Sequence, residues 1–269
     1  MSKLAMIRTL KAVALFLSLS AGAASAQDMM RDVDLASPDM VSAEMTRADV
    51  EAAVATATQA APADFTGKRL SNLDLSRIDL SGANFRAARM NKTKFIGAKL
   101  DRAILDQAWL LEADFSGASL RGANLFAAQM HRARLDGADL SHSRIAADLT
   151  GASLVGASIA GANLGADMRN QSMGLMRAVL RSANLEQLDA RGADLSRVDL
   201  EFASLRGADL SGASLRGAQL GGADLTGVTV VGTDFDGADL ASARLIAAIG
   251  LERASNFDRA KNRDRLIRE

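Results

Sequence analysis

The sequence contains no cysteine and no tyrosine, and only two prolines and one tryptophan in 269 residues. Without cysteine the chain can form neither a disulfide nor a thiolate metal site, and it cannot carry a lipid on a cysteine. The 32 basic and 32 acidic side chains cancel, so net charge points to neither nucleic acid nor a membrane as a partner. Aromatic residues make up 4% of a chain that is 48% hydrophobic, so a core must consist mainly of alanine and leucine.

Groups suited to catalysis or ligand binding are also scarce. His131 and His142 are the only histidines, and neither is flanked by acidic residues at a spacing typical of a metal site or a catalytic triad. The glycines match neither of the common phosphate-binding motifs nor the calcium-binding glycine repeat. The sequence therefore predicts no cofactor, no metal and no active site, and an enzyme is the least favoured class.

The N-terminus resembles a secretory signal over residues 1–26. Basic residues precede a short apolar run at 12–19, and the small residues 24–26 precede Gln27. The apolar run is shorter than the roughly 20 residues that a membrane-spanning helix needs. We therefore expect export to a bacterial periplasm or the exterior, with no stable membrane anchor after cleavage. The alternative is an N-terminal anchor helix that stays attached.

Residues 27–63 have a different composition, with seven acidic side chains, two basic ones and both prolines of the chain. Thr46 followed by Asp49 resembles a helix capping box, and the alanine-rich stretch 47–58 has good helix propensity. This composition predicts an acidic, alanine-rich linker that contains a short helix.

From about Lys68 to Ala248 the sequence repeats every five residues. Each unit has a small residue, then a polar residue, then a large apolar residue, and glycine is frequent two positions later. Residues 208–212, Ala-Asp-Leu-Ser-Gly, show the complete pattern. In the first half the large apolar residues are Leu70, Leu75, Leu80, Phe85, Met90, Phe95, Leu100, Leu105, Leu110, Phe115, Leu120, Leu125, Met130, Leu135, Leu140 and Ile145.

A five-residue period fits neither the 3.6-residue period of a helix nor a continuous two-residue alternation. It fits a chain that extends for three residues and then turns a corner, so that the small and large apolar residues both point inward. Four such sides close a coil of 20 residues, and stacked coils bury each leucine against the leucine 20 residues away. We count 36 units, or nine coils, and predict an all-β parallel solenoid over residues 64–249.

This pattern resembles the pentapeptide repeat family over about 180 residues. The resemblance implies a right-handed quadrilateral β-helix. Departures from the period occur at Ile145–Leu149, at Leu164–Met168 and at Met168–Leu175, and they predict a bulge at 166–175. At Leu188 and Ala190 the large and small inward residues exchange places.

Residues 250–269 lose the repeat and carry an excess of basic side chains. Ser255 and Asp258 have the spacing of a helix cap, so we expect a capping helix that covers the open edge of the last coil. Some members of the family dimerise through a C-terminal helix, which implies a possible homodimer here.

A group of apolar residues occupies positions that should face solvent. Ile104, Trp109, Leu111 and Phe126 fall on two adjoining faces in neighbouring coils, close to Gln129 and His131. Exposed apolar groups that include an aromatic residue often mark contact sites, so these six residues are the candidate partner contact. The alternative is that the N-terminal segment folds back and covers them.

The known activity of acidic family members, mimicry of DNA toward a type II topoisomerase, is the first function that the resemblance implies. It requires a continuous acidic face, whereas the column Asp79, Lys99, Ser119, Asp139 is interrupted by a lysine. We instead expect an exported scaffold or protein-binding module with a protein partner and no nucleic acid. The second hypothesis is a purely structural envelope component or self-assembling solenoid.

Overall fold

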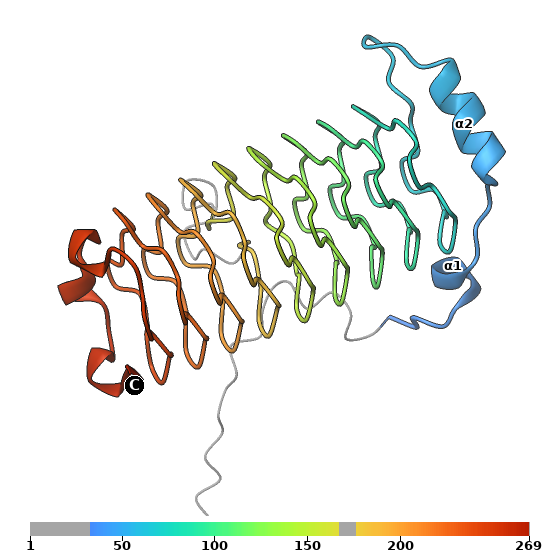
Figure 1. Cartoon of the computed structure of the whole chain (residues 1–269). Helices are drawn as coiled ribbons and strands as arrows, with labels where there is room; N and C mark the ends of the chain where they lie inside the picture. The colour runs from blue at the N-terminus through green and yellow to red at the C-terminus, as the bar shows by residue number, and fades with distance from the viewer. Residues whose placement is uncertain (1–32, 167–175, 269) are drawn as a thin grey trace, which may run out of the picture.

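The computed structural model describes residues 33–166 and 176–268, and its main body is a tube of stacked coils (Figure 1). Each coil has four sides, and each side pairs with the next coil through one parallel bridge. We name the four faces of the tube by their first residues: face A begins at Asp64, face B at Arg69, face C at Asp74 and face D at Asp79. None of the helices in the described residues is long and apolar enough to cross a membrane.

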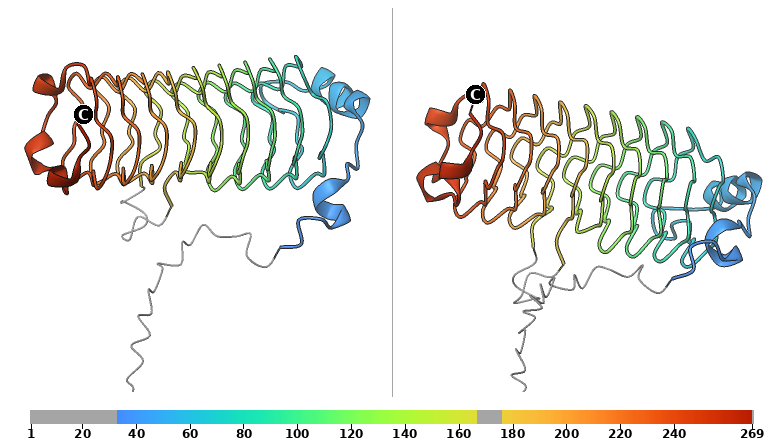
Figure 2. Two further views of the ribbon diagram at one scale, coloured as in Figure 1. Left: turned by 60° about the horizontal axis from the view of Figure 1, so that its bottom comes forward. Right: turned by 90° about the horizontal axis from the view of Figure 1, so that it is seen from below.

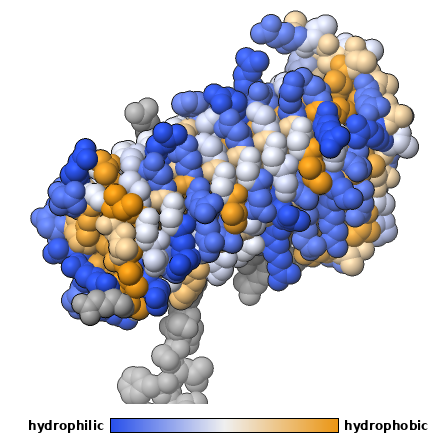
Figure 3. All heavy atoms as spheres, in the orientation of Figure 1, coloured by the Kyte–Doolittle hydropathy of each residue, from blue (hydrophilic) through white to orange (hydrophobic). Residues whose placement is uncertain are grey.

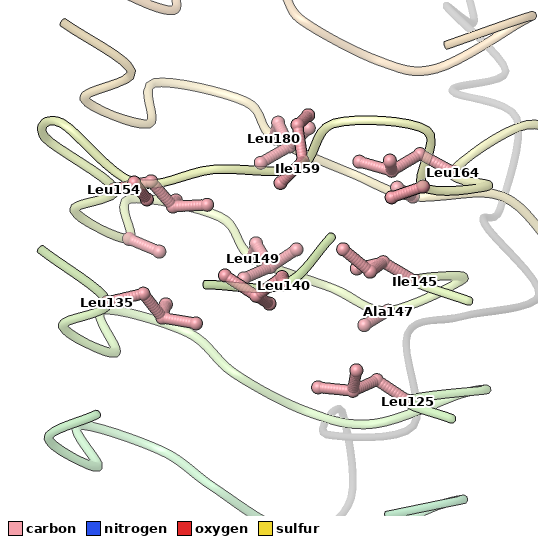
Figure 4. Packing of buried hydrophobic residues seen from close by; sticks show 14 of the residues in the cluster. Leu125, Leu135, Leu140, Ile145, Ala147, Leu149, Leu154, Ile159, Leu164 and Leu180 are labelled. Carbon is pink, nitrogen blue, oxygen red and sulfur yellow. The ribbon is translucent and has the colours of Figure 1, made fainter. Parts of the chain in front are cut away.

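The core of the tube consists of the small and the large apolar residues of each unit. Ala208 and Leu210 are fully buried, whereas Asp209 between them points outward and is half-buried. The buried leucines of successive coils lie above one another, as the close view of the interior shows (Figure 4). Phenylalanines stack in the same way near the N-terminal end, where the rings of Phe65 and Phe85 are 5.0 Å apart. Each buried leucine contributes about 1.5–3 kcal/mol, so the repeat itself supplies the stability of the tube.

The corners of the coils use left-handed backbone at the second residue after each leucine. Glycine commonly occupies this position, but Phe202 also adopts it, with φ of 60°. The ring of Phe202 lies over Gly222 of the next coil, where an added Cβ would be 2.7 Å from the ring. At this corner the ring of Phe202 leaves no room for a side chain on residue 222 of the next coil.

The segment predicted as a linker forms a cap on the first coil instead. Helix α1 (Pro38–Val41) and helix α2 (Arg47–Ala55) lie across the N-terminal end of the tube (Figure 1). Ala43 between them pairs with Leu70 in an antiparallel bridge, and Val50 of α2 is completely buried. Composition suggested a linker because the segment is acidic, but its few apolar side chains face the open core.

The repeat is interrupted at the corner between faces A and B. The Ala178 amide donates to the Leu164 carbonyl at 3.1 Å, so the two ends of the interruption are in contact. Val179 then pairs with Asp148, and face B continues in register. Residues 165–177 are therefore an insertion at this corner. Met168 and Leu175, which the sequence analysis counted as repeat units, lie outside the described residues, as does nearly all of the predicted bulge.

The C-terminal segment contains three single-turn 3-10 helices in place of the predicted capping helix: η1 (Leu251–Arg253), η2 (Phe257–Arg259) and η3 (Arg263–Arg265). Between the turns, Ser255, Lys261 and Ile267 continue faces A, B and C. Figure 2 shows this segment stacked on the end of the tube.

Backbone pairing explains why no helix forms there. The Ser255 amide donates to the Thr233 carbonyl at 2.8 Å, which continues the ladder and leaves Ser255 without a capping bond. Asn256 then adopts left-handed backbone with φ of 54°, and its side-chain amide donates to Asp234 at 2.8 Å. The segment is a further coil with six-residue sides, so the end of the tube keeps an open edge.

Candidate functional site

The outward apolar residues are held on adjoining faces by the ladder. Trp109 lies on face B between Arg89 and Gln129, and Ile104 lies on face A between Asn84 and Asn124. The Met90 amide donates to the Trp109 carbonyl at 2.7 Å, which fixes the backbone beneath the indole. Both Ile104 and Trp109 are half-buried, so part of each side chain remains open to solvent.

Leu111 and Phe126 lie at the two corners that border face B. The Gln107 amide donates to the Phe126 carbonyl at 2.8 Å, so Phe126 stands beside the corner that leads to Trp109. The guanidinium of Arg144 lies 4.7 Å from the centroid of the Phe126 ring, a cation–π contact that holds the ring in place. Leu111 and Phe126 are half-buried.

Gln129 differs from the other predicted contacts because it is only 1% exposed. Its Nε2 donates to the Ala127 carbonyl at 3.3 Å, and its Oε1 has no hydrogen-bond partner in the described structure. A buried side chain cannot touch a partner, so Gln129 does not belong to the contact surface. The sequence could not show this because its position in the repeat is normally outward.

His131 is half-buried and paired. Its Nε2 lies 3.2 Å from Oδ2 of Asp148 in the next coil. Burial of Asp148 raises the pKa of its carboxyl, but hydrogen bonds from His131 and Thr150 outweigh burial and hold that pKa below its usual value. His131 therefore supports the surface through its contact with Asp148 in the next coil. We call Ile104, Trp109, Leu111, Phe126 and His131 the Trp109 surface.

The described N-terminal residues reach the edge of this surface but bond to the coil before it. The Asn91 amide donates to the Met40 carbonyl at 3.1 Å, and the Leu111 amide donates to Oδ1 of Asn91 at 3.0 Å. Other hydrogen bonds of the cap to the tube end on residues 69–76. Of the two expectations for the apolar group, the described cap thus favours a surface that is partly open.

Sequence reasoning missed one exposed aromatic residue. Phe202, at the corner between faces B and C, is 63% exposed, the highest value among the large apolar residues that the structure describes. The signal was present, because Phe202 stands where most units have glycine or a polar residue. Its ring lies on Gly222, and Phe202 follows His131, the last residue of the Trp109 surface in the sequence, by 71 residues.

The family model for pentapeptide repeats matches residues 69–141 and 175–249 in overlapping copies, and these residues make up more than half of the chain. The chain belongs to the pentapeptide repeat family. Members of this family are right-handed quadrilateral β-helices, in agreement with the four-sided ladder described above. No match was found among curated proteins.

Several solved structures are similar to this pentapeptide repeat protein. HetL, a pentapeptide repeat protein involved in the regulation of heterocyst differentiation in the cyanobacterium Nostoc sp. strain PCC 7120, is 29% identical, with 83% of this chain and all of that chain covered and a TM-score of 0.30. QnrB1, a plasmid-mediated fluoroquinolone resistance protein, is 19% identical, with 73% and 84% covered and a TM-score of 0.36. A protein of the Arabidopsis thaliana thylakoid lumen is 26% identical, with 46% and 61% covered and a TM-score of 0.21.

Many of the described outward side chains are held by contacts between coils. No group of three or more histidine, aspartate or glutamate side chains among them is arranged to hold a metal ion. Outward side chains are tied to neighbouring coils by ion pairs such as Arg181–Asp199 at 2.9 Å and Arg216–Asp236 at 2.9 Å. What the tube offers is a fixed pattern of side chains on flat faces.

Proposed function

We propose that this protein is a non-enzymatic, exported scaffold that binds a protein partner through the Trp109 surface. The observation that carries the proposal is the clustering of Ile104, Trp109 and Phe126 on a rigid ladder at outward positions where most other units have polar residues. Aromatic side chains held in one rotamer and flanked by polar groups supply most of the binding energy at protein interfaces. A rigid tube loses little conformational entropy when it binds.

The insertion supports the choice of this corner. The corner between faces A and B departs from the regular repeat in three successive coils. These departures are Phe126, the shortened step at Ala146–Ala147 and the insertion 165–177. Departures from a regular repeat are the places where a solenoid differs from one member of a family to another, and insertions commonly border the binding face.

Export rests on the signal-like residues 1–26, which lie outside the described residues. The basic start, the short apolar run and the small residues before Gln27 support secretion into a bacterial periplasm or beyond. Fractionation of cells that express the full chain tests this part, together with the mass of the product. A full-length protein in the cytoplasmic fraction would refute export without affecting the binding proposal.

Substitution of two aromatic residues tests the binding proposal. The double variant W109S/F126S should keep its β circular dichroism and lose capture of its partner from periplasmic extract. Phe202→Ser is the matched control, because it removes an exposed aromatic residue outside the surface and should capture as the wild type does. Equal capture by all three proteins would rule out this surface.

A further inference from the structure

The two ends of the tube carry opposite charge. Residues 33–82, which form the cap and the first coil, hold eight acidic and four basic side chains, whereas residues 249–268 at the other end hold three acidic and six basic ones. Unlike ends therefore attract and like ends repel. A second copy of this chain, placed head to tail, is the partner that this polarity favours.

Apolar side chains are exposed at the same two ends. Leu35 and Val41 on the cap are 40% and 46% exposed, and Ile249 and Ile267 on the last coil are 59% and 38% exposed. These are four of the six large apolar residues that stand out on the described surface. Apolar residues appear at both ends of the space-filling view, while the sides of the tube between them are mostly polar (Figure 3).

The ladder has matching free edges on face D. Within the tube, the Lys99 amide donates to the Ile78 carbonyl at 2.9 Å, and the Leu80 amide donates to the Lys99 carbonyl at 2.7 Å. At the N-terminal edge of face D, the amide and carbonyl of Asp79 make no backbone hydrogen bond within the described structure. The cap bonds to faces B and C, so it leaves this edge open.

The other end of face D offers the complementary groups. Ile249 is its last residue, and the carbonyl of Ala248 and the amide of Gly250 have no backbone partner among the described residues. In a continued ladder, the next residue on face D would donate its amide to the Ala248 carbonyl and accept a hydrogen bond from the Gly250 amide. Asp79 of a second copy has one free donor and one free acceptor at the spacing of a parallel strand.

The open edge at Asp79 lies in a cleft that can receive an apolar side chain. The cleft has a volume of about 630 Å³ and is lined by Val54, Ala57 and Pro62 from the cap and by Asp79 and Arg102 from the coils. Ile249 lies on face D, as Asp79 does. When face D continues from one copy to the next, the Ile249 side chain of the first copy would reach the cleft of the second.

We propose that copies of this chain associate head to tail, the last coil of one copy docking on the capped first coil of the next, with the face D ladder continued from Ile249 to Asp79. The cap occupies the ends of faces B and C in one copy, and Ser255, Lys261 and Ile267 extend faces A, B and C beyond Ile249 in the other. The two tubes therefore meet at an angle and share the ladder on face D alone. Such a contact uses two different surfaces and does not close on itself, so it produces open chains rather than dimers.

Sedimentation velocity of the purified protein tests this proposal. The wild-type protein should show species larger than a dimer that grow with concentration and diminish as salt rises, because salt screens the opposite charges. Ile249→Asp places a carboxylate against Asp79 and the acidic cap, and it should abolish association. Phe202→Asp makes the same chemical change at an equally exposed site on the side of the tube and should leave association unchanged. A protein that is monomeric at every concentration, or that stops at a dimer, would overturn the proposal.

A mixing experiment separates head-to-tail from tail-to-tail contact. The I249D variant keeps an intact capped end, so it should add to wild-type chains, terminate them and shorten the average chain length. If the variant never joins wild-type chains, the contact does not involve two different ends. The proposal is independent of the Trp109 surface, and W109S/F126S should therefore associate as the wild type does.

Discussion

Single residues in this tube are constrained by the coil on each side of them. The corner glycines show this most directly, because the backbone there is left-handed whether or not a side chain is present. Gly212 and Gly222 have nearly equal φ angles of 67° and 68°, but only Gly222 lies under a ring, that of Phe202. Substitution at Gly212 therefore measures backbone strain alone, whereas substitution at Gly222 measures backbone strain together with the steric conflict with Phe202.

Gly222→Ala should destabilise the protein more than Gly212→Ala. Both changes impose the cost of a left-handed alanine, about 1–2 kcal/mol, and at Gly222 the new Cβ also displaces Phe202. Guanidinium denaturation of both variants measures the difference, which should disappear in a Phe202→Ala background. If the two glycine variants were equally stable, the ring would not rest on Gly222.

Buried amides give a second contrast at the residue scale. Asn91 is 7% exposed and bonded at both ends of its amide, whereas the amide oxygen of the equally buried Gln129 has no described partner. Gln129→Leu should therefore be neutral or stabilising, while Asn91→Leu should cost about 1–3 kcal/mol because it leaves the Leu111 amide without a partner and removes one of the two donors to the Met40 carbonyl. Thermal denaturation of both variants compares them, and a large loss in Gln129→Leu would show that its oxygen is satisfied.

The inward residues followed from the sequence because the period fixes them. The outward ones did not, since their exposure depends on neighbours 20 positions away. Gln129 and Trp109 occupy the same face in successive coils, yet one is buried and the other half-open. Phe202 was overlooked because it occupies the left-handed corner position at which glycine is frequent in the repeat.

At the scale of elements, α2 is the part of the cap that closes the core. Thr46 and Asp49 form a reciprocal capping box: the Thr46 backbone amide donates to Asp49 at 2.8 Å, and the Asp49 amide donates to Thr46 Oγ1 at 3.3 Å. The sequence pattern identified this box, but nothing in the composition showed that Val50 would be buried against the first coil.

Thr46→Ala should destabilise the N-terminal end by about 1 kcal/mol, because the first turn of α2 loses its cap. Hydrogen exchange should rise in α2 and in the first coil while the coils beyond about residue 105 stay protected, since a solenoid transmits stability only between neighbouring coils. Thr56→Ala, at the other end of α2, is the control. A uniform rise along the tube would contradict a local cap.

The C-terminal end was predicted least well. A serine followed three positions later by an aspartate favours a helix, but at Ser255 and Asp258 the ladder offered by Thr233 prevails. The six-residue spacing of Ser255, Lys261 and Ile267 was the signal, and it was hidden because the leucine of each unit is missing.

At the scale of the whole molecule, many aspartates share one arrangement in which the carboxylate accepts hydrogen bonds from the residue two positions on. For Asp64 and Asp79 the following hydroxyl, that of Thr66 or Ser81, is the main reason that the pKa of the carboxyl lies below its usual value. For Asp224 burial raises the pKa, but hydrogen bonds from Thr226 and Arg206 outweigh it.

These lowered pKa values make stability depend on pH in the acid range. A carboxyl whose pKa is lower in the folded state stabilises the fold fully above its unfolded value of about 3.9, and this contribution is lost as pH falls through the folded value. The free energy of unfolding should therefore decrease below about pH 4. Ser81→Ala raises the pKa of Asp79 toward the unfolded value and should make the dependence shallower. Denaturation midpoints measured from neutral to acid pH that stay constant would contradict this.

The tube as a whole was predictable because one period determines its architecture, whereas its working surfaces arise where the period is broken. The Trp109 surface lies beside the shortened and inserted corners, and the two ends differ from every internal coil. The most direct test is site-specific photo-crosslinking in living cells from position 109, with position 184 on face C as the control. We predict one discrete adduct from position 109 that is lost in Phe126→Ser and absent from position 184. Equal crosslinking from both positions, or none from 109, would contradict a binding site on this face.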